Sequence, residues 1–187
     1  MALPDSPAAR HAAVAAELSR IAAGTADWSA PTPVDGWTAR DVVDHLITWF
    51  RGFLAAGGVE LPSGPPIDDP VGAWEHHAAA VQELIEQRGD EEFTHPFAGT
   101  SLLADAVDRF YTSDVFMHSW DLARAGGQQP DLDEDHAADL LAGMRPMEDV
   151  LRSSGHYGPA VPVADDAPVV DRLMGFVGRD PAWSPPA

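Results

Sequence analysis

Ionisable side chains occupy the inward face of a predicted helix over residues 100–125. Asp114, His118 and Asp121 follow the apolar Leu103 and Val107 at spacings that keep side chains on one helical face. A carboxylate at a core-facing position needs a partner, because burying an unpaired charge is costly. His118 lies one turn after Asp114, so both side chains can reach one metal ion. The whole face consists of Leu103, Val107, Phe110, Asp114, His118, Asp121 and Ala125.

A second predicted helix supplies a further imidazole. His45 lies three residues after Val42 and four before Trp49, so it points inward as they do. Two imidazoles and one carboxylate from facing helices form a plausible metal site in the core of a bundle. Three protein ligands leave an open coordination position, which is the pattern of catalytic sites. Zn²⁺, Ni²⁺ and Fe²⁺ all accept such ligands, and Zn²⁺ is the first expectation.

Two neighbouring residues are expected to support this site. Asp121 is predicted either to orient a metal-binding histidine or to pair with Arg124. Arg124 or Arg179 could hold an anionic substrate, although Arg124 is favoured as the structural partner of Asp121. The catalytic and substrate-binding residues are not identified by the sequence.

Interpretations of these residues that involve no metal remain open. His45 could be a buried core histidine, and Asp114 and His118 could simply bond to each other. The other histidines have no convergent neighbours and are expected on the surface or in loops, although His77 alone is conceivable as a ligand. These are His11, His76, His77, His95, His136 and His156.

The elements that position these residues are predicted to be helical almost throughout. Helices are expected over residues 7–24, 38–56, 71–88, 100–125 and 167–177. A further helix is expected to begin at about residue 132 and to be kinked at Pro146. Thr38 and Asp41 form a capping box, and the segment 57–70 is a loop rich in Pro and Gly. Residues 156–163 are expected to be short and extended. The pattern predicts an all-α, up-down four-helix bundle with short additional C-terminal helices. We expect one domain over 1–187, with the bundle at about 7–153 and a C-terminal extension at about 156–187.

Composition excludes several functions. The 187 residues include no Cys and no Lys, which excludes thiolate nucleophiles, Cys-ligated zinc and Lys Schiff bases. The formal net charge of −19 argues against partners such as nucleic acid or anionic membranes. No apolar run is long enough for a membrane span, and the N-terminus does not read as a signal peptide. We therefore expect a cytoplasmic protein, either a monomer or a homodimer.

Three stretches resemble a known family. They are residues 34–46 (VDGWTARDVVDHL), 114–125 (DVFMHSWDLARA) and 175–183 (GFVGRDPAW). Together they resemble the actinobacterial metal-binding proteins related to mycothiol-dependent maleylpyruvate isomerase, within the DinB/YfiT-like group. The resemblance implies a DinB-like four-helix bundle that holds one divalent metal at His45, Asp114 and His118. In that family the usual acidic ligand is a Glu, whereas the matching residue here is Asp114. The isomerase also has a separate C-terminal domain, whereas only about 60 residues follow Gly127 here.

These observations lead to three functional hypotheses. The first is a metal-dependent enzyme, a mycothiol-type transferase or isomerase that uses an external low-molecular-weight thiol, or one that uses a metal-bound water. Any thiol must be external because the chain has no Cys. The second is a non-catalytic module that binds or senses a metal or small ligand. The third is a helical interaction protein in which Asp114 and His118 form a buried polar pair.

Overall fold

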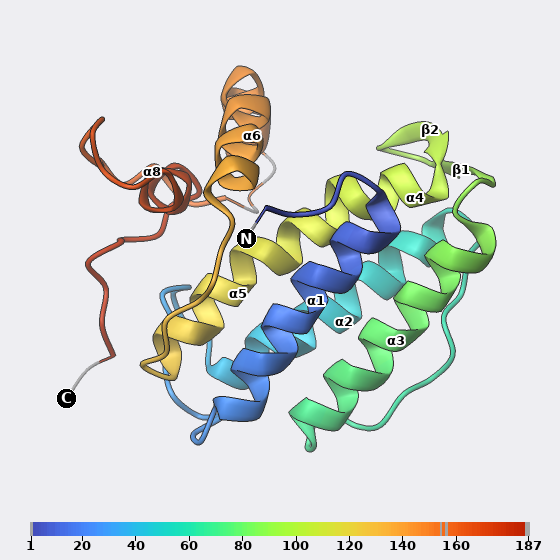
Figure 1. Ribbon diagram of the computed structural model, residues 1–187, viewed down its shortest axis with the longest axis horizontal. Helices are drawn as coiled ribbons and strands as arrows, with labels where there is room; N and C mark the ends of the chain where they lie inside the picture. Colours follow the sequence, from blue (N-terminus) through green and yellow to red (C-terminus); the bar gives the residue numbers. More distant parts are fainter. Residues whose placement is uncertain (1, 154, 156, 186–187) are drawn as a thin grey trace.

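The architecture comes from a computed structural model that describes residues 2–153, 155 and 157–185. It is an all-α bundle with one β-hairpin (Figure 1). The elements in chain order are α1 (Pro7–Gly24), α2 (Ala39–Ala56), α3 (Pro70–Arg88), β1 (Glu92–His95), β2 (Gly99–Leu102), α4 (Leu103–Ala106), the π-helix η1 (Val107–Thr112), α5 (Ser113–Ala125), α6 (Glu134–Met144), the 3₁₀-helix η2 (Arg145–Met147), α7 (Glu148–Ser153) and α8 (Val169–Phe176).

Side-chain caps begin the main helices. The predicted capping box is confirmed: the Thr38 backbone N–H donates to Asp41 Oδ2 at 2.7 Å, and the Asp41 N–H donates to Thr38 Oγ1 at 3.4 Å. Ser6 and Asp69 cap α1 and α3 by a simpler contact, in which the side chain accepts a bond from a backbone N–H of the first turn, and each is followed by a proline at the start of the helix. The starts of three bundle helices are therefore specified locally by the sequence.

Helices α1, α2, α3 and α5 form the bundle, in which α1 and α2 each contact both α3 and α5. The expected all-α bundle is confirmed, with one refinement of its order: α2 and α3 run in the same direction (Figure 1). Arg40, at the start of α2, lies 3.9 Å from Asp68, just before α3. The loop 57–69 can span about 43 Å when extended, more than the roughly 27 Å of α2, so it can return the chain along the whole helix.

A β-hairpin precedes the helix that carries Asp114. The prediction of a helix from residue 100 is therefore wrong, because residues 99–102 form β2, which pairs antiparallel with β1. Phe93 and His95 are buried while their neighbours in β1 are exposed, the alternation typical of a strand. Gly99 adopts a positive φ of 78° where the chain turns into β2. The hairpin packs its Phe93 against Gly57 at the end of α2.

The π-helix η1 changes which residues face the core. The N–H of Ser113 bonds to the carbonyl of Asp108, five residues earlier, so the turn is wider than in an α-helix. Tyr111 is fully buried, whereas Phe110, which the regular spacing placed on the inward face, is only partly buried. Within η1, Val107 is buried as the stripe predicts, whereas Tyr111 takes the inward position predicted for Phe110.

The C-terminal region packs beside the bundle. Phe116 of α5 contacts His136 of α6 at 4.9 Å between ring centroids, and α6 packs against α8. α6 ends at Met144, and η2 holds Pro146, as the predicted kink requires. Residues 157–168 have no helix or strand, and His156 lies outside the described residues. Within the described part of the chain, no helix has both the length and the apolar character needed to cross a bilayer.

Candidate metal centre

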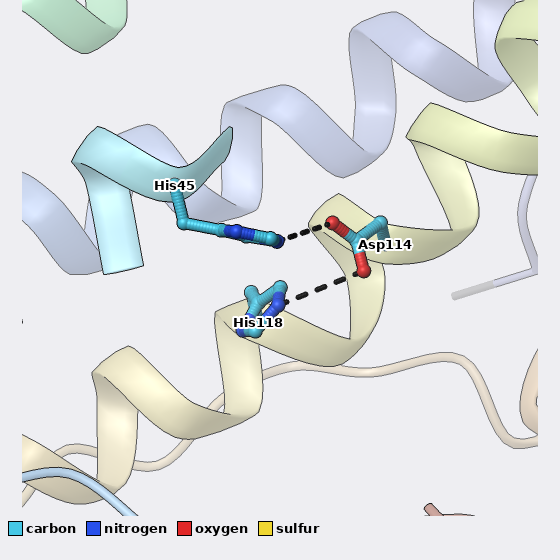
Figure 2. A group of neighbouring side chains, drawn as sticks. All are labelled: His45, Asp114 and His118. Carbon is cyan, nitrogen blue, oxygen red and sulfur yellow. Dashed lines mark ion pairs between the residues drawn. The ribbon is translucent and has the colours of Figure 1, made fainter. Parts of the chain in front are cut away.

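His45 from α2 meets Asp114 and His118 from α5 (Figure 2). His45 Nε2 lies 3.3 Å from Asp114 Oδ2, and His118 Nε2 lies 3.6 Å from Asp114 Oδ1. One ligand atom of each residue lies within 4.8 Å of the others. Across the described ranges, no other three His, Cys, Asp or Glu side chains converge in this way. The structure thus brings together the residues that the helical spacing singled out.

A tryptophan of α2 fixes the carboxylate. Trp49, one turn after His45, donates its indole N–H to Asp114 Oδ2 at 2.9 Å. The sequence pattern predicts a core position for Trp49, and the only sequence signal of its polar role is its spacing of four residues from His45. Burial raises the pKa of Asp114, but His118, His45 and Trp49 together outweigh burial and hold that pKa below its usual value. The carboxylate is therefore kept ionised.

Trp37 covers both imidazoles. Its ring is stacked on His118, with centroids 5.6 Å apart and planes 14° from parallel. The same ring lies 4.8 Å from that of His45. Trp37 directly precedes the N-cap of α2, so the capping box that begins the helix also sets the backbone from which this ring projects. The side chain of His118 is only 5% exposed, while that of His45 is 28% exposed, which leaves the centre open on the α2 side.

A buried ion pair lies behind His118. Asp121 is completely buried, and its Oδ2 lies 2.9 Å from His118 Nδ1, so Asp121 contacts the imidazole as predicted. Arg179 donates to both oxygens of Asp121, at 3.3 and 3.1 Å. Burial raises the pKa of Asp121, but Arg179 and His118 outweigh it and hold that pKa below its usual value.

The predicted pairing of Asp121 with Arg124 is wrong. Arg124 donates instead to the carbonyl oxygens of Pro181 and Trp183, at 2.6 and 2.8 Å. Along α5, Arg124 lies three residues after Asp121, but its guanidinium turns over the ring of Trp120 toward the C-terminal tail. Both arginines considered for an anionic substrate are therefore bonded to protein groups.

The segment after α7 also reaches the centre through Tyr157. Burial, followed by the charge of Asp114, raises the pKa of this phenol to about 12, so the hydroxyl stays protonated at neutral pH. Tyr157 is not among the predicted site residues, because nothing in the sequence around it indicates proximity to α5.

Three histidines expected on the surface or in loops are buried. His11 and His77 are 1% and 2% exposed, so the expectation of a surface or loop position is wrong for both. His11 Nδ1 lies 2.7 Å from Gln82 Oε1, which gives the ring a polar partner inside the bundle. His77 packs edge-on against Tyr111. His95 is also buried, in β1, where its ring stacks on Phe53. None of the three lies in the cluster with His45.

Comparisons with known proteins identify a family and two relatives. Residues 8–123 match the family model described as the mycothiol maleylpyruvate isomerase N-terminal domain. Two relatives, uncharacterized proteins Rv0738 and MT0763 of two Mycobacterium tuberculosis strains, are each 32% identical over 157 residues. The match covers 80% of this chain and 83% of each relative. No solved structure matches. His45, Asp114 and His118 lie within the matched range, whereas Arg179 lies beyond it.

Proposed function

Because this chain belongs to the mycothiol maleylpyruvate isomerase N-terminal domain family, we propose that it is a metal-dependent enzyme acting with a low-molecular-weight thiol such as mycothiol. His45, Asp114 and His118 would hold one divalent ion. The observation that carries this proposal is the convergence of three ligand atoms, all within 4.8 Å of one another, from two facing helices.

The donor atoms suit a borderline metal. Two imidazole nitrogens and one carboxylate are accepted by Zn²⁺, Ni²⁺ and Fe²⁺, and Zn²⁺ is favoured because three such ligands are typical of its catalytic sites. When bound, such an ion lowers the pKa of a thiol or water placed at its remaining coordination position. The thiol must come from outside, because the chain has no Cys.

The chain's own residues prepare the ligands. Asp121 faces His118 Nδ1 and so favours the tautomer that keeps the lone pair on Nε2, the nitrogen that faces Asp114. Trp49 fixes one oxygen of Asp114, and Trp37 covers both imidazoles on one side. These contacts restrict the rotamers of all three ligands before a metal arrives, as preorganised metal sites require.

Metal analysis is the first experiment. Purified without chelator, the wild type should contain about one divalent ion per chain, and His45→Ala and His118→Ala should contain far less. His95→Ala is the matched control, since it removes a buried imidazole that lies outside the cluster. Thiol conjugation with mycothiol should then depend on the metal and be lost with a chelator.

The outcomes separate the alternatives. Metal without turnover would identify a binding or sensor module and contradict the enzymatic part of the proposal. A metal-free wild type would contradict the proposal as a whole and favour the helical interaction protein.

A further inference from the structure

A cavity of about 210 Å³ lies beneath the loop that joins α2 to α3. It is separate from the metal centre, because its α2 residues, Ile47 and Arg51, are rotated about 200° and 240° from His45 around that helix. The loop contributes Ser63, Gly64 and Pro65, and α3 contributes Ala73, His76 and His77.

The polar groups of this cavity are basic or neutral. Arg51 donates to the carbonyl oxygens of Pro62 and Leu61 at 2.7 and 3.0 Å, which fixes its guanidinium at the wall. Of the five N–H groups of an arginine, these bonds use two and leave three. Within the described part of the chain, no carboxylate forms an ion pair with Arg51, although the protein carries 30 acidic residues.

Two imidazoles lie beside this uncompensated charge. The Nε2 atoms of His76 and His77 are both buried and have no hydrogen-bond partner among the described residues. Burial, and then the charge of Arg51, lower the pKa of His77 to about 3. The surroundings of His77 are thus electropositive in a chain whose net charge is −19.

We propose that this cavity is a binding site for a small anion that carries a carboxylate or phosphate group. The free N–H groups of Arg51 match the oxygens of such an anion, and the imidazoles add further donors. The loop closes tightly over the site: a Cβ at Gly64 would lie 2.6 Å from the ring of His76, so only glycine fits there without displacing that ring. The volume suits a small metabolite, not a macromolecule.

Calorimetric titration with inorganic phosphate and with succinate tests the proposal, at constant ionic strength in a zwitterionic buffer with chloride. We expect saturable binding of at least one of the two probes to the wild type. Arg51→Met should weaken it by about 10-fold or more, since hydrogen bonds between charged groups are lost. Tighter binding of phosphate would identify a phosphorylated ligand, and tighter binding of succinate a carboxylate.

Arg40→Met is the matched control, because it removes the same charge from the same helix at an exposed position. Its affinity should equal that of the wild type. His77→Leu keeps the bonds between Arg51 and the loop, so its weaker binding would show that loosening of the loop is not the cause. Amide NMR shifts on phosphate addition should be confined to residues 47–51, 63–65 and 73–77. Equal binding by Arg51→Met and Arg40→Met, shifts centred on α5, or no saturable binding of either probe would overturn the proposal.

Discussion

Arg179 joins the C-terminal segment to the candidate metal centre through one buried carboxylate, that of Asp121. Its guanidinium bonds both oxygens of Asp121, which in turn faces His118. Replacement by Met leaves a buried charge without its counter-ion, so we expect Arg179→Met to lower the free energy of unfolding by about 3 kcal/mol. Because Asp121 then loses its fixed orientation, metal affinity should also fall by about 10- to 100-fold. Urea denaturation and competition with a metal-sensitive dye measure the two effects.

Arg124→Met separates a structural effect from a positioning effect. Arg124 donates to carbonyl oxygens of the tail and lies over the ring of Trp120, so its loss should reduce stability and leave metal affinity unchanged. Equal metal affinity in Arg179→Met and Arg124→Met would contradict a positioning role for Arg179.

The buried imidazole of His77 predicts a pH-dependent stability. In the folded protein the pKa of His77 is about 3, below the ordinary value of 6.5. Below pH 6.5 this imidazole therefore binds a proton in the unfolded chain and remains neutral in the folded protein. The stability contributed by neutral His77 is complete above pH 6.5 and is lost as the pH falls from 6.5 toward 3. Between pH 7 and pH 5 this loss amounts to about 2 kcal/mol. His77→Leu should flatten the decline, measured by urea denaturation in a phosphate-free buffer; an unchanged slope would assign the decline to other groups.

The sequence predicted residues that share a helix better than residues from distant segments. Asp114 and His118 follow from helical spacing, and His45 from its place between Val42 and Trp49. Tyr157 and Arg179 could not be placed, because their approach to α5 depends on how the C-terminal segment packs. Local periodicity contains no information about that packing.

At the scale of elements, the capping box of α2 also supports the centre, because Trp37 directly precedes the N-cap and His45 lies in the first two turns of this helix. Thr38→Ala removes two of the three hydrogen bonds between Thr38 and Asp41, both made by the hydroxyl, and should destabilise the protein by about 1 kcal/mol. Thermal denaturation should show a lower midpoint for Thr38→Ala and a nearly unchanged midpoint for Thr38→Ser, which keeps the hydroxyl. In the Thr38→Ala background, Asp41→Ala should cost less than it does alone; strict additivity would show that the two side chains do not act together.

Helices with clear caps and apolar stripes were predicted well, and irregular elements were not. The ends of α1 and α2 agree with the sequence prediction within one residue. The hairpin was missed because four-residue strands give too short an alternation to compete with a neighbouring helical pattern. The π-helix was missed because the residue types of 107–112 do not distinguish its wider turn from that of an α-helix.

At the scale of the whole molecule, the excess of negative charge opposes folding. A net charge of −19 on 187 residues creates self-repulsion that is stronger in the compact state. Raising the salt concentration from about 0.05 M to about 0.5 M shortens the Debye length from roughly 14 Å to roughly 4 Å, so we expect the melting temperature to rise. Differential scanning calorimetry in NaCl and in KCl tests this, since screening acts equally in both. A falling midpoint would show that stabilising surface ion pairs outweigh the repulsion.

The direction of α3 is a whole-molecule property that the sequence left undetermined. The loop 57–69 is irregular, as predicted. Its composition does not determine whether the chain turns back beside α2 or returns to the start of α2. Its length permits either course. The second course is observed, and it forms the cavity at Arg51.

The placement of the three convergent residues within 8–123 has a consequence for engineering. The residues after 123 contribute Tyr157 and Arg179 around the centre and none of the three. A chimera could therefore replace everything after α5 with the corresponding segment of a relative and keep His45, Asp114 and His118 intact, provided that the graft returns a cation to Asp121. Such exchanges would vary the surroundings of one constant metal centre and show how far a tail alone selects the chemistry.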